Sequence, residues 1–297
     1  MFANQVKSIL VSSSSCLPSL WTVNRRGMAT LKMISMRLKS VKNIQKITQS
    51  MKMVSAAKYT RAERELKLAL AFGDGSQAFY EQAEVTPPEN AKNELIIAIS
   101  SDRGLCGAVH TSVGRLIRSK LQNKSDNVKV VCVGDKARAL LQRLFGQNIL
   151  YVAKEIGRSP PTFEDAARVA TAISDSGFEY DSGTIVYNKF KSVVSYTTSQ
   201  IPIYSVSSVN SAPKITLYDS VDPDVLQNYI EFSLASQLYY AMKENACSEQ
   251  SSRMTAMDNA SKNAAEMIEK LSLAFNRTRQ AVITRELIEI ISGASAL

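Results

Sequence analysis

The chain has 297 residues, a formal net charge of +9 and a hydrophobic fraction of 45%. That length and apolar content suffice for a buried core and exclude a wholly disordered chain. No apolar run reaches the roughly 18 to 20 residues that cross a bilayer, which excludes an integral membrane protein.

The first segment, residues 1–28, has the composition of a mitochondrial transit peptide. It is rich in serine, it carries Lys7, Arg25 and Arg26, and every charged residue before Glu63 is a lysine or arginine. Import receptors and the membrane potential read such a positive, acid-free leader, whereas a secretory signal needs a longer apolar core. We expect cleavage shortly after Arg26, near residues 27–29.

Residues 29–88 and 219–297 are expected to form two long terminal helices. Neither glycine nor proline occurs between Gly27 and Gly73, or between Pro223 and Gly293. Segments of this length without breakers favour a coiled coil. Acidic residues and Pro223 at the start of the second segment suit a helix N-terminus.

Apolar residues spaced three and four apart predict the seam of this coiled coil. In the first helix the expected seam is Ile34, Leu38, Val41, Ile44, Ile47, Met51 and Val54. In the second helix it is Met254, Met257, Ser261, Ala264, Ile268, Leu271, Phe275, Thr278 and Val282. Small and polar members make this seam thin, and the two halves come from opposite ends of the chain, so an antiparallel pairing is expected.

Residues 89–218 predict a small α/β domain with Rossmann-like order, inserted between the two helices. Apolar runs bounded by turn residues predict buried strands, and amphipathic stretches predict helices. The expected strands are 94–100, 128–134, 149–154, 184–190, 192–198 and 201–206, with a hairpin among the last three; the expected helices are 108–122, 135–144 and 163–174.

The loop Ser100-Ser-Asp-Arg-Gly-Leu-Cys-Gly107 stands where phosphates often bind in such domains. It lacks both the G-x-G-x-x-G fingerprint and the P-loop pattern, so nucleotide binding is not favoured. We interpret it as a tight turn from which Arg103 projects. His110, the one histidine, has no companion ligands, and Cys106 is expected to be an inert, half-buried thiol. The four cysteines form no Cys-x-x-Cys pair, so neither a disulfide framework nor a structural zinc site is predicted. No metal site and no cofactor is expected.

The first helix is basic, which suits either nucleic acid or an acidic protein surface. It has no interleaved aromatic residues and no recognised reading motif, so an acidic protein partner is favoured over nucleic acid. Glu286 and Glu289 share a helix face in the last segment, where ion pairing is favoured over acid/base catalysis.

Three motifs resemble the gamma subunits of F-type ATP synthases. They are the C-terminal pattern Ile283-Thr284-x-Glu286-x-x-Glu289-x-x-x-Gly293-Ala294, the stretch Asn43-Ile-Gln-Lys-Ile-Thr-Gln-Ser-Met-Lys-Met-Val54, and the loop 101–107. The resemblance extends from about residue 29 to residue 297, and the leader points to the mitochondrial version of this family.

The resemblance implies a non-catalytic rotor shaft on the matrix side of the mitochondrial inner membrane. In that family the terminal helices form an axle inside three α and three β subunits. The α/β domain is a foot on the membrane c-ring and on the delta and epsilon stalk subunits. One copy per complex is implied, with no nucleic acid. Proton flow turns the ring and axle, and the axle drives each β subunit through its catalytic states.

The same resemblance implies partner-binding residues. Arg279 and Gln280 match the positions that bond a catch loop on β. Arg103, Arg115 and Arg118 match a basic surface that faces acidic loops of the β C-terminal domains, and Met51 and Lys52 lie at a comparable level on the first helix. The alternative is that these arginines are solvated charges on the helix surface and bind no partner.

Two other functions remain as alternatives. One is a basic mitochondrial coiled-coil module that holds nucleic acid or an acidic scaffold, which steep salt dependence of binding would favour. The other is an enzyme whose helices are dimer arms, which a saturable metabolite site near Gly104 would favour.

Overall fold

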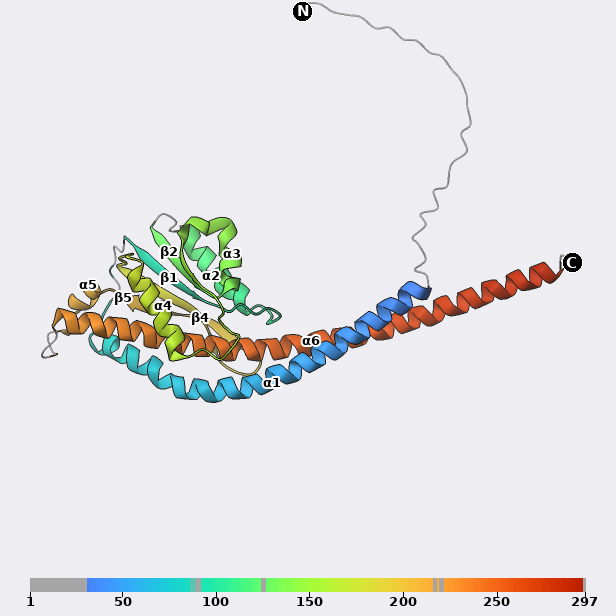
Figure 1. Cartoon of the computed structure of the whole chain (residues 1–297), viewed down its shortest axis with the longest axis horizontal. Helices are drawn as coiled ribbons and strands as arrows, with labels where there is room; N and C mark the ends of the chain where they lie inside the picture. The colour runs from blue at the N-terminus through green and yellow to red at the C-terminus, as the bar shows by residue number, and fades with distance from the viewer. Residues whose placement is uncertain are drawn as a thin grey trace, which may run out of the picture. The chain divides into compact units, whose positions relative to one another are not determined.

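The structure, a computed structural model, describes residues 31–86, 88, 92–123, 127–215, 218 and 222–295. The expected transit peptide lies outside the described residues. Two helices begin and end the described chain, α1 (Leu31–Gln82) and α6 (Pro223–Ser295), and are labelled in Figure 1. The chain divides into two compact units: one comprises Ser40–Lys270, and the other holds the start of α1 and the end of α6 (described residues 31–39 and 271–295).

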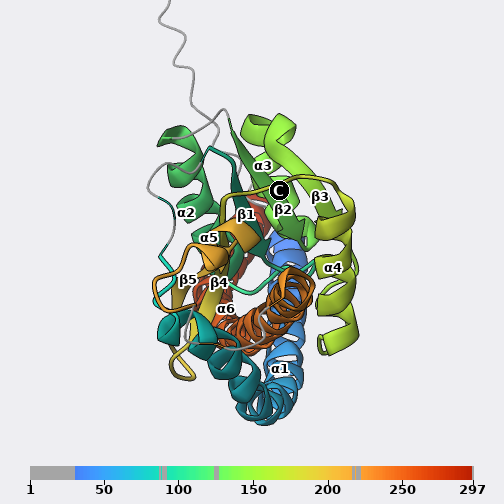
Figure 2. The same cartoon turned by 90° about the vertical axis from the view of Figure 1, so that its left-hand side faces the viewer.

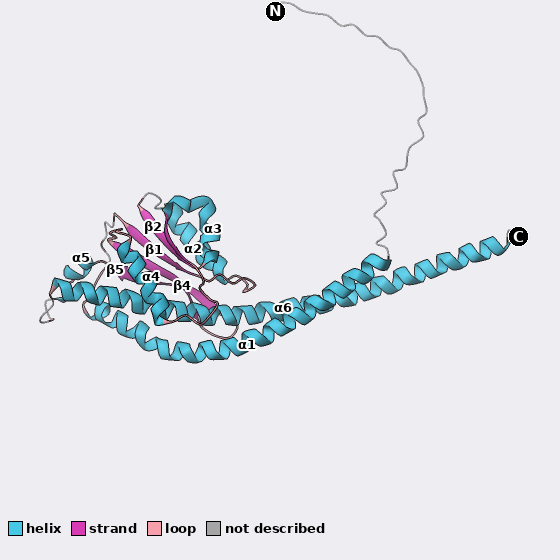
Figure 3. Cartoon of the chain, viewed as in Figure 1, coloured by secondary structure: helices cyan, strands magenta, loops and turns pink. Residues whose placement is uncertain are grey.

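The part of the chain between the two long helices forms a five-stranded sheet with its own helices, and Figure 3 colours the strands magenta. The elements are β1 (Glu94–Ile99), α2 (Val109–Asn123), β2 (Val128–Val133), α3 (Asp135–Phe145), the 3-10 turn η1 (Gly146–Asn148), β3 (Ile149–Ala153), α4 (Phe163–Asp175), β4 (Ser182–Phe190), β5 (Tyr196–Tyr204) and α5 (Val206–Asn210). The strand order is β3-β2-β1-β4-β5, and only the β4–β5 pair is antiparallel. The predicted mixed α/β class with long terminal helices is confirmed.

Helices cover both faces of the sheet (Figure 2). On one face, side chains of β1 and β2 pack with α2 and α3, around Ile96, Val130 and Ile117. On the other face, β1 and β4 pack with α4 and α6, around Ile97, Ile185 and Leu238. Because both faces are covered, the central strands are continuous apolar runs, which is why the sequence identifies them.

The end of the sheet differs from the prediction of two strands at 192–198 and 201–206. Residues 191–195 form the turn of a hairpin, and one strand, β5, then runs from Tyr196 to Tyr204. Pro202 lies inside this strand, opposite Thr184. Proline is tolerated there because β5 is an edge strand, so the missing N–H breaks no inner ladder. Residues 206–210, expected partly as strand, form the short helix α5.

Within Ser40–Lys270 the long helices pack against each other antiparallel. Lys52 pairs with Asp258 and Glu65 pairs with Lys243, so residues later in α1 contact residues earlier in α6. Gly73 does not end α1. A Cβ atom on Gly73 would lie 2.8 Å from the ring of Tyr240, so this glycine permits a close approach of the two helices.

The predicted seam of α1 is wrong at three of its positions beyond Val41, although Met51 is half-buried as expected. Ile44, Ile47 and Val54 are about half exposed, at 49%, 58% and 57%. The buried positions are instead Thr48 and Ser55, at 8% and 3% exposure. The inward face of α1 is therefore the more polar one, and an apolar row faces outward. The seam predicted for α6 is confirmed, since its members are buried or half-buried from Met257 to Val282.

Candidate partner-binding site

The loop that joins β1 to α2, residues 100–108, has an irregular backbone. Leu105 has φ 61° and Gly107 has φ 65°, so two residues of this loop adopt the left-handed conformation. That conformation is unusual for leucine, and it places an apolar side chain 65% exposed to solvent. Arg103 is exposed beside it, as the sequence predicted.

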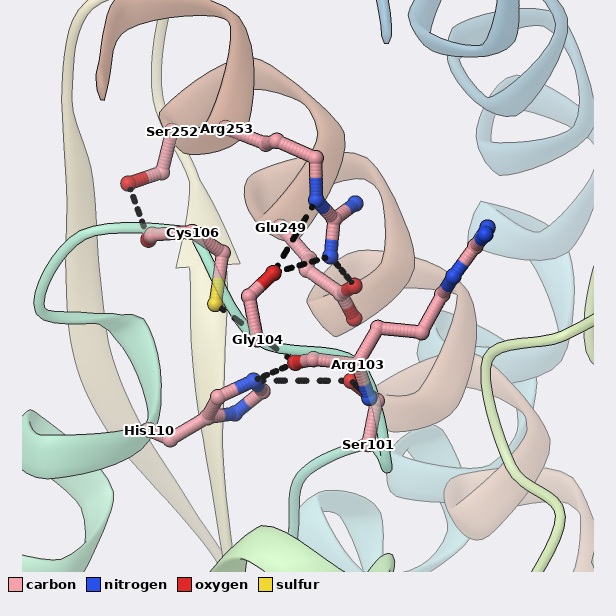
Figure 4. A network of polar contacts seen from close by, with 8 residues as sticks. All are labelled: Ser101, Arg103, Gly104, Cys106, His110, Glu249, Ser252 and Arg253. Atoms are coloured by element: carbon pink, nitrogen blue, oxygen red, sulfur yellow. Dashed lines mark hydrogen bonds and ion pairs between the residues drawn. The ribbon is translucent and has the colours of Figure 1, made fainter. Parts of the chain in front are cut away.

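Side chains of α6 hold this loop in place (Figure 4). The Ser252 hydroxyl donates a hydrogen bond to the Cys106 carbonyl at 2.8 Å, and the Arg253 guanidinium donates to the Gly104 carbonyl at 3.4 Å. Arg253 also pairs with Glu249, and both side chains are almost fully buried. The loop is thus fixed to α6 by directed bonds to its carbonyl groups.

His110 supports the same loop from α2. Its Nε2 atom lies 3.0 Å from the Arg103 carbonyl oxygen and 3.4 Å from the Ser101 hydroxyl (Figure 4). Burial lowers the pKa of His110, which therefore donates to the carbonyl as a neutral imidazole at neutral pH. Burial raises the pKa of the Cys106 thiol to about 11, which leaves it protonated and unreactive. Both residues have the structural roles that the sequence favoured.

Side chains of the β1–α2 loop cap the N-terminus of α3. Asp102 Oδ1 accepts the backbone N–H of Asp135 at 2.6 Å, and the Ser100 hydroxyl accepts that of Ala137 at 3.1 Å. These N–H groups belong to the first turn of α3, where they have no partner within the helix. Gly134, with φ 99°, leaves no room for a Cβ atom against Ser101. These bonds join the β1–α2 loop to the start of α3.

A groove runs beside the loop, between α1 and α6. Its lining is Ser50, Met51, Val54, Ser55, Lys58, Arg103, Gly104, Leu105, Gln250 and Arg253. Burial lowers the pKa of Lys58, and the positive charges of Arg103 and Arg253 lower it further. The groove therefore combines exposed apolar side chains with an excess of positive charge, which suits an acidic protein surface that carries apolar residues.

The structure brings together some of the predicted site residues and separates others. Met51 and Arg103 line this groove together. Lys52 turns toward α6, where its Nζ lies 2.6 Å from Asp258 Oδ1. Arg115 is exposed on α2, whereas the Arg118 guanidinium donates to the Leu140 carbonyl and ties α2 to α3.

The predicted residues near the C-terminus lie on the last turns of α6, in the unit formed by residues 31–39 and 271–295. Arg279, Gln280, Ile283, Thr284, Glu286, Glu289, Gly293 and Ala294 are all exposed. Exposed apolar side chains accompany them: Ile283, Leu287, Ile288, Ile290 and Ile291 are 50% to 70% exposed. Contiguous apolar surface of this kind marks a protein interface.

Sequence reasoning missed Glu249, Ser252 and Arg253. The available signal was the spacing of an acid and a base four residues apart on a helix, which permits an ion pair. The spacing does not reveal that this pair is buried beneath a loop some 150 positions earlier in the chain.

Comparison with known proteins identifies the family. A family model described as ATP synthase matches residues 30–297. The mitochondrial ATP synthase subunit gamma of Drosophila melanogaster is 67% identical over 92% of this chain and 92% of its own length. The chain belongs to the gamma-subunit family of ATP synthases.

Solved structures of ATP synthase chains have a similar fold. The chain is similar to one from the central stalk and c-ring of Tetrahymena thermophila mitochondrial ATP synthase, with 29% identity, a TM-score of 0.65, and coverage of 72% of this chain and 99% of that one. A chain of the Euglena gracilis mitochondrial ATP synthase has the same fold, with a TM-score of 0.75 at 20% identity over 91% of this chain and 95% of its own.

Membership of this family makes the chain a mitochondrial stalk subunit that is not itself catalytic. Within residues 31–295, setting aside the short undescribed gaps, no cluster of His, Cys, Asp and Glu could hold a metal ion. In the same part of the chain, every helix is too polar or too short to cross a membrane.

Proposed function

We propose that the chain is the rotor shaft that couples proton-driven rotation of the membrane c-ring to sequential conformational change and ATP synthesis in the β subunits. It acts as one copy among three α and three β subunits, on the matrix side of the inner membrane, and its α/β domain rests on the c-ring with the delta and epsilon stalk subunits. Gamma-family membership, with a relative 67% identical, is the observation that carries this proposal.

The physical basis is asymmetry. A single shaft cannot present the same surface to three identical partners, so it favours a different conformation in each of them. Moving a partner from 1:99 to 99:1 requires about 5.5 kcal/mol of differential binding. A few charge-assisted hydrogen bonds of about 1.5–3 kcal/mol each supply that amount.

Two surfaces are proposed to make these contacts. Arg279 and Gln280, exposed on α6, bind the catch loop of β. The groove with Met51 and Arg103, together with Arg115, receives the acidic loops of the β C-terminal domains. Lys52 and Arg118 belong to the same proposal. Each is less available to a partner, because Lys52 pairs with Asp258 and Arg118 donates to the Leu140 carbonyl.

The first test is assembly. A tagged chain expressed in mitochondria and purified gently should recover three α and three β subunits per copy, together with the c-ring. A homodimer, or nucleic acid in place of those subunits, would contradict the rotor function.

The second test addresses the catch residue. Arg279→Ala should lower ATP synthesis and hydrolysis by the assembled enzyme without loss of the folded chain, because the side chain is exposed and makes no ion pair within the described residues. Normal turnover and normal pumping by this variant would remove Arg279 from the proposal.

A further inference from the structure

Four polar residues of α6 form one row that faces the β4–β5 hairpin, and we call them the hairpin row: Glu244, Asn245, Ser248 and Ser251. Their spacing places them on one side of the helix. Each is at most 3% exposed. They lie in the same compact unit as the sheet.

Three residues of the hairpin row bond to the backbone of the hairpin. The Ser248 hydroxyl donates to the Asn188 carbonyl at 3.0 Å. The backbone N–H of Phe190 donates to the Glu244 carboxylate at 2.7 Å. At the turn, the Ser251 hydroxyl donates to the Val193 carbonyl at 2.6 Å. Three side chains of the helix thus hold the backbone of the strand and of its turn.

Asn188 extends this connection into the rest of the α/β domain. Its side chain is fully buried in β4, and its Nδ2 donates to Asn245 Oδ1 at 3.0 Å and to the Val109 carbonyl at 3.1 Å. Its Oδ1 accepts from the Thr198 hydroxyl at 3.0 Å and lies 3.1 Å from the Ser112 hydroxyl. One amide therefore links α6 with α2, β4 and β5.

Directed bonds restrict rotation of the helix in a way that apolar packing does not. Hydrophobic burial is non-directional, so a helix held only by leucines loses little when it turns a few degrees. A buried hydrogen bond weakens steeply when its angle changes, and an unpaired buried group costs more than the bond contributes. A turn of α6 about its own axis would strain all three of these hydrogen bonds at once.

We infer that the hairpin row and Asn188 are positioning residues that fix the rotational setting of α6 against the α/β domain, so that torque passes between them without slip. This inference rests on the proposed rotor function. It concerns contacts inside the chain and no contact with a partner.

The test uses assembled ATP synthase in membrane vesicles, with Ser248→Ala and Ser251→Ala combined. This double variant removes two directed bonds and leaves the apolar packing in place. ATP hydrolysis should stay near the wild-type rate, whereas ATP-driven proton pumping per ATP should fall about twofold. If the double variant does not assemble, Ser251→Ala alone is measured in the same assay, since it removes only the bond to the turn. Its ratio of proton pumping to ATP hydrolysis should also fall below that of the wild type.

The matched control is Ser236→Ala. Ser236 is buried on the same helix at 2% exposure, but its hydroxyl has no hydrogen-bond partner within the described residues. Its ratio of pumping to hydrolysis should equal that of the wild type. An equal fall in the control, or a double variant in which pumping and hydrolysis are unchanged or fall by the same factor, would overturn the inference.

Failure of the inference and failure of the rotor function give different results. If the wild-type chain restores pumping to a complex that lacks its gamma subunit and the variant pumps equally well, only the positioning role falls. If the wild-type chain restores no pumping at all, the rotor function falls with it.

Discussion

Two parts of α6 show opposite relations between polarity and burial. Between Ser233 and Arg253 the helix buries serines, an asparagine, two glutamates and an arginine, each at 7% exposure or less. From Ile283 onward it exposes five large apolar side chains. The first part is covered by its own chain, which supplies partners for buried polar groups. The second part has apolar surface that the described chain does not cover, as expected of a surface that enters a partner.

The largest effect is predicted for a substitution that breaks a buried ion pair in the first of these two parts of α6. Arg253→Ala leaves the Glu249 carboxylate buried without its partner, and should lower the free energy of unfolding by about 3–5 kcal/mol. Urea unfolding of the purified chain measures this. Replacement of both residues by methionine should recover most of the loss, because no unpaired charge remains. A double variant as unstable as Arg253→Ala would contradict a buried ion pair.

The next effect tests the close approach of α1 to this part of α6. Gly73→Ala places a methyl group against the Tyr240 ring and should destabilise the chain by about 1–3 kcal/mol. Gly75→Ala is the matched control, because nothing lies within 4 Å of its Cβ position. It should stabilise the helix by up to about 1 kcal/mol. Equal thermal shifts of the same sign in the two variants would refute the packing argument.

A smaller effect on stability, with a large effect on assembly, is expected at the exposed end. Ile288→Ser combined with Ile291→Ser should change the free energy of unfolding by no more than about 0.5 kcal/mol, since both side chains are more than half exposed. Recovery of the variant chain with α and β subunits should nevertheless fall. Loss of stability in the isolated chain would mean that the chain itself covers these residues.

The smallest effect concerns Asp258, a half-buried carboxylate that pairs with both Lys52 and Lys262. Hydrogen bonds from Lys262 and then Lys52 lower its pKa to about 2 from a usual 3.8. Its stabilising contribution is therefore present above pH 3.8 and is lost as the pH falls through about 2. Urea midpoints of the wild type and of Asp258→Asn should differ at pH 6 and converge near pH 2. A constant difference across that range would exclude the ionic contribution.

How much the sequence predicts depends on which partner an element packs against. The predicted inner strands agree with the structure to within two residues, because a parallel sheet covered on both faces needs uninterrupted apolar runs. The sequence predicts two strands where the structure has the single strand β5. An edge strand tolerates Pro202 and polar residues that would end an inner strand. The predicted seam of α1 is misplaced because apolar spacing identifies an apolar face of a helix without showing what that face packs against. Ile44, Ile47 and Val54 form such a face, but they are exposed and do not pack on α6.

The amino-acid sequence alone is enough to predict the two long helices, the inserted α/β domain, the lack of a nucleotide fingerprint and the resemblance to the gamma family. These features depend on local spacing, on breakers and on short motifs. The folded structure is needed to see that the inner face of α1 is polar, that Arg253 holds the β1–α2 loop while paired with Glu249, and that Asn188 joins α6 to the sheet. Those contacts connect residues far apart in the chain, and the free energy of a buried polar group depends on partners that folding brings to it.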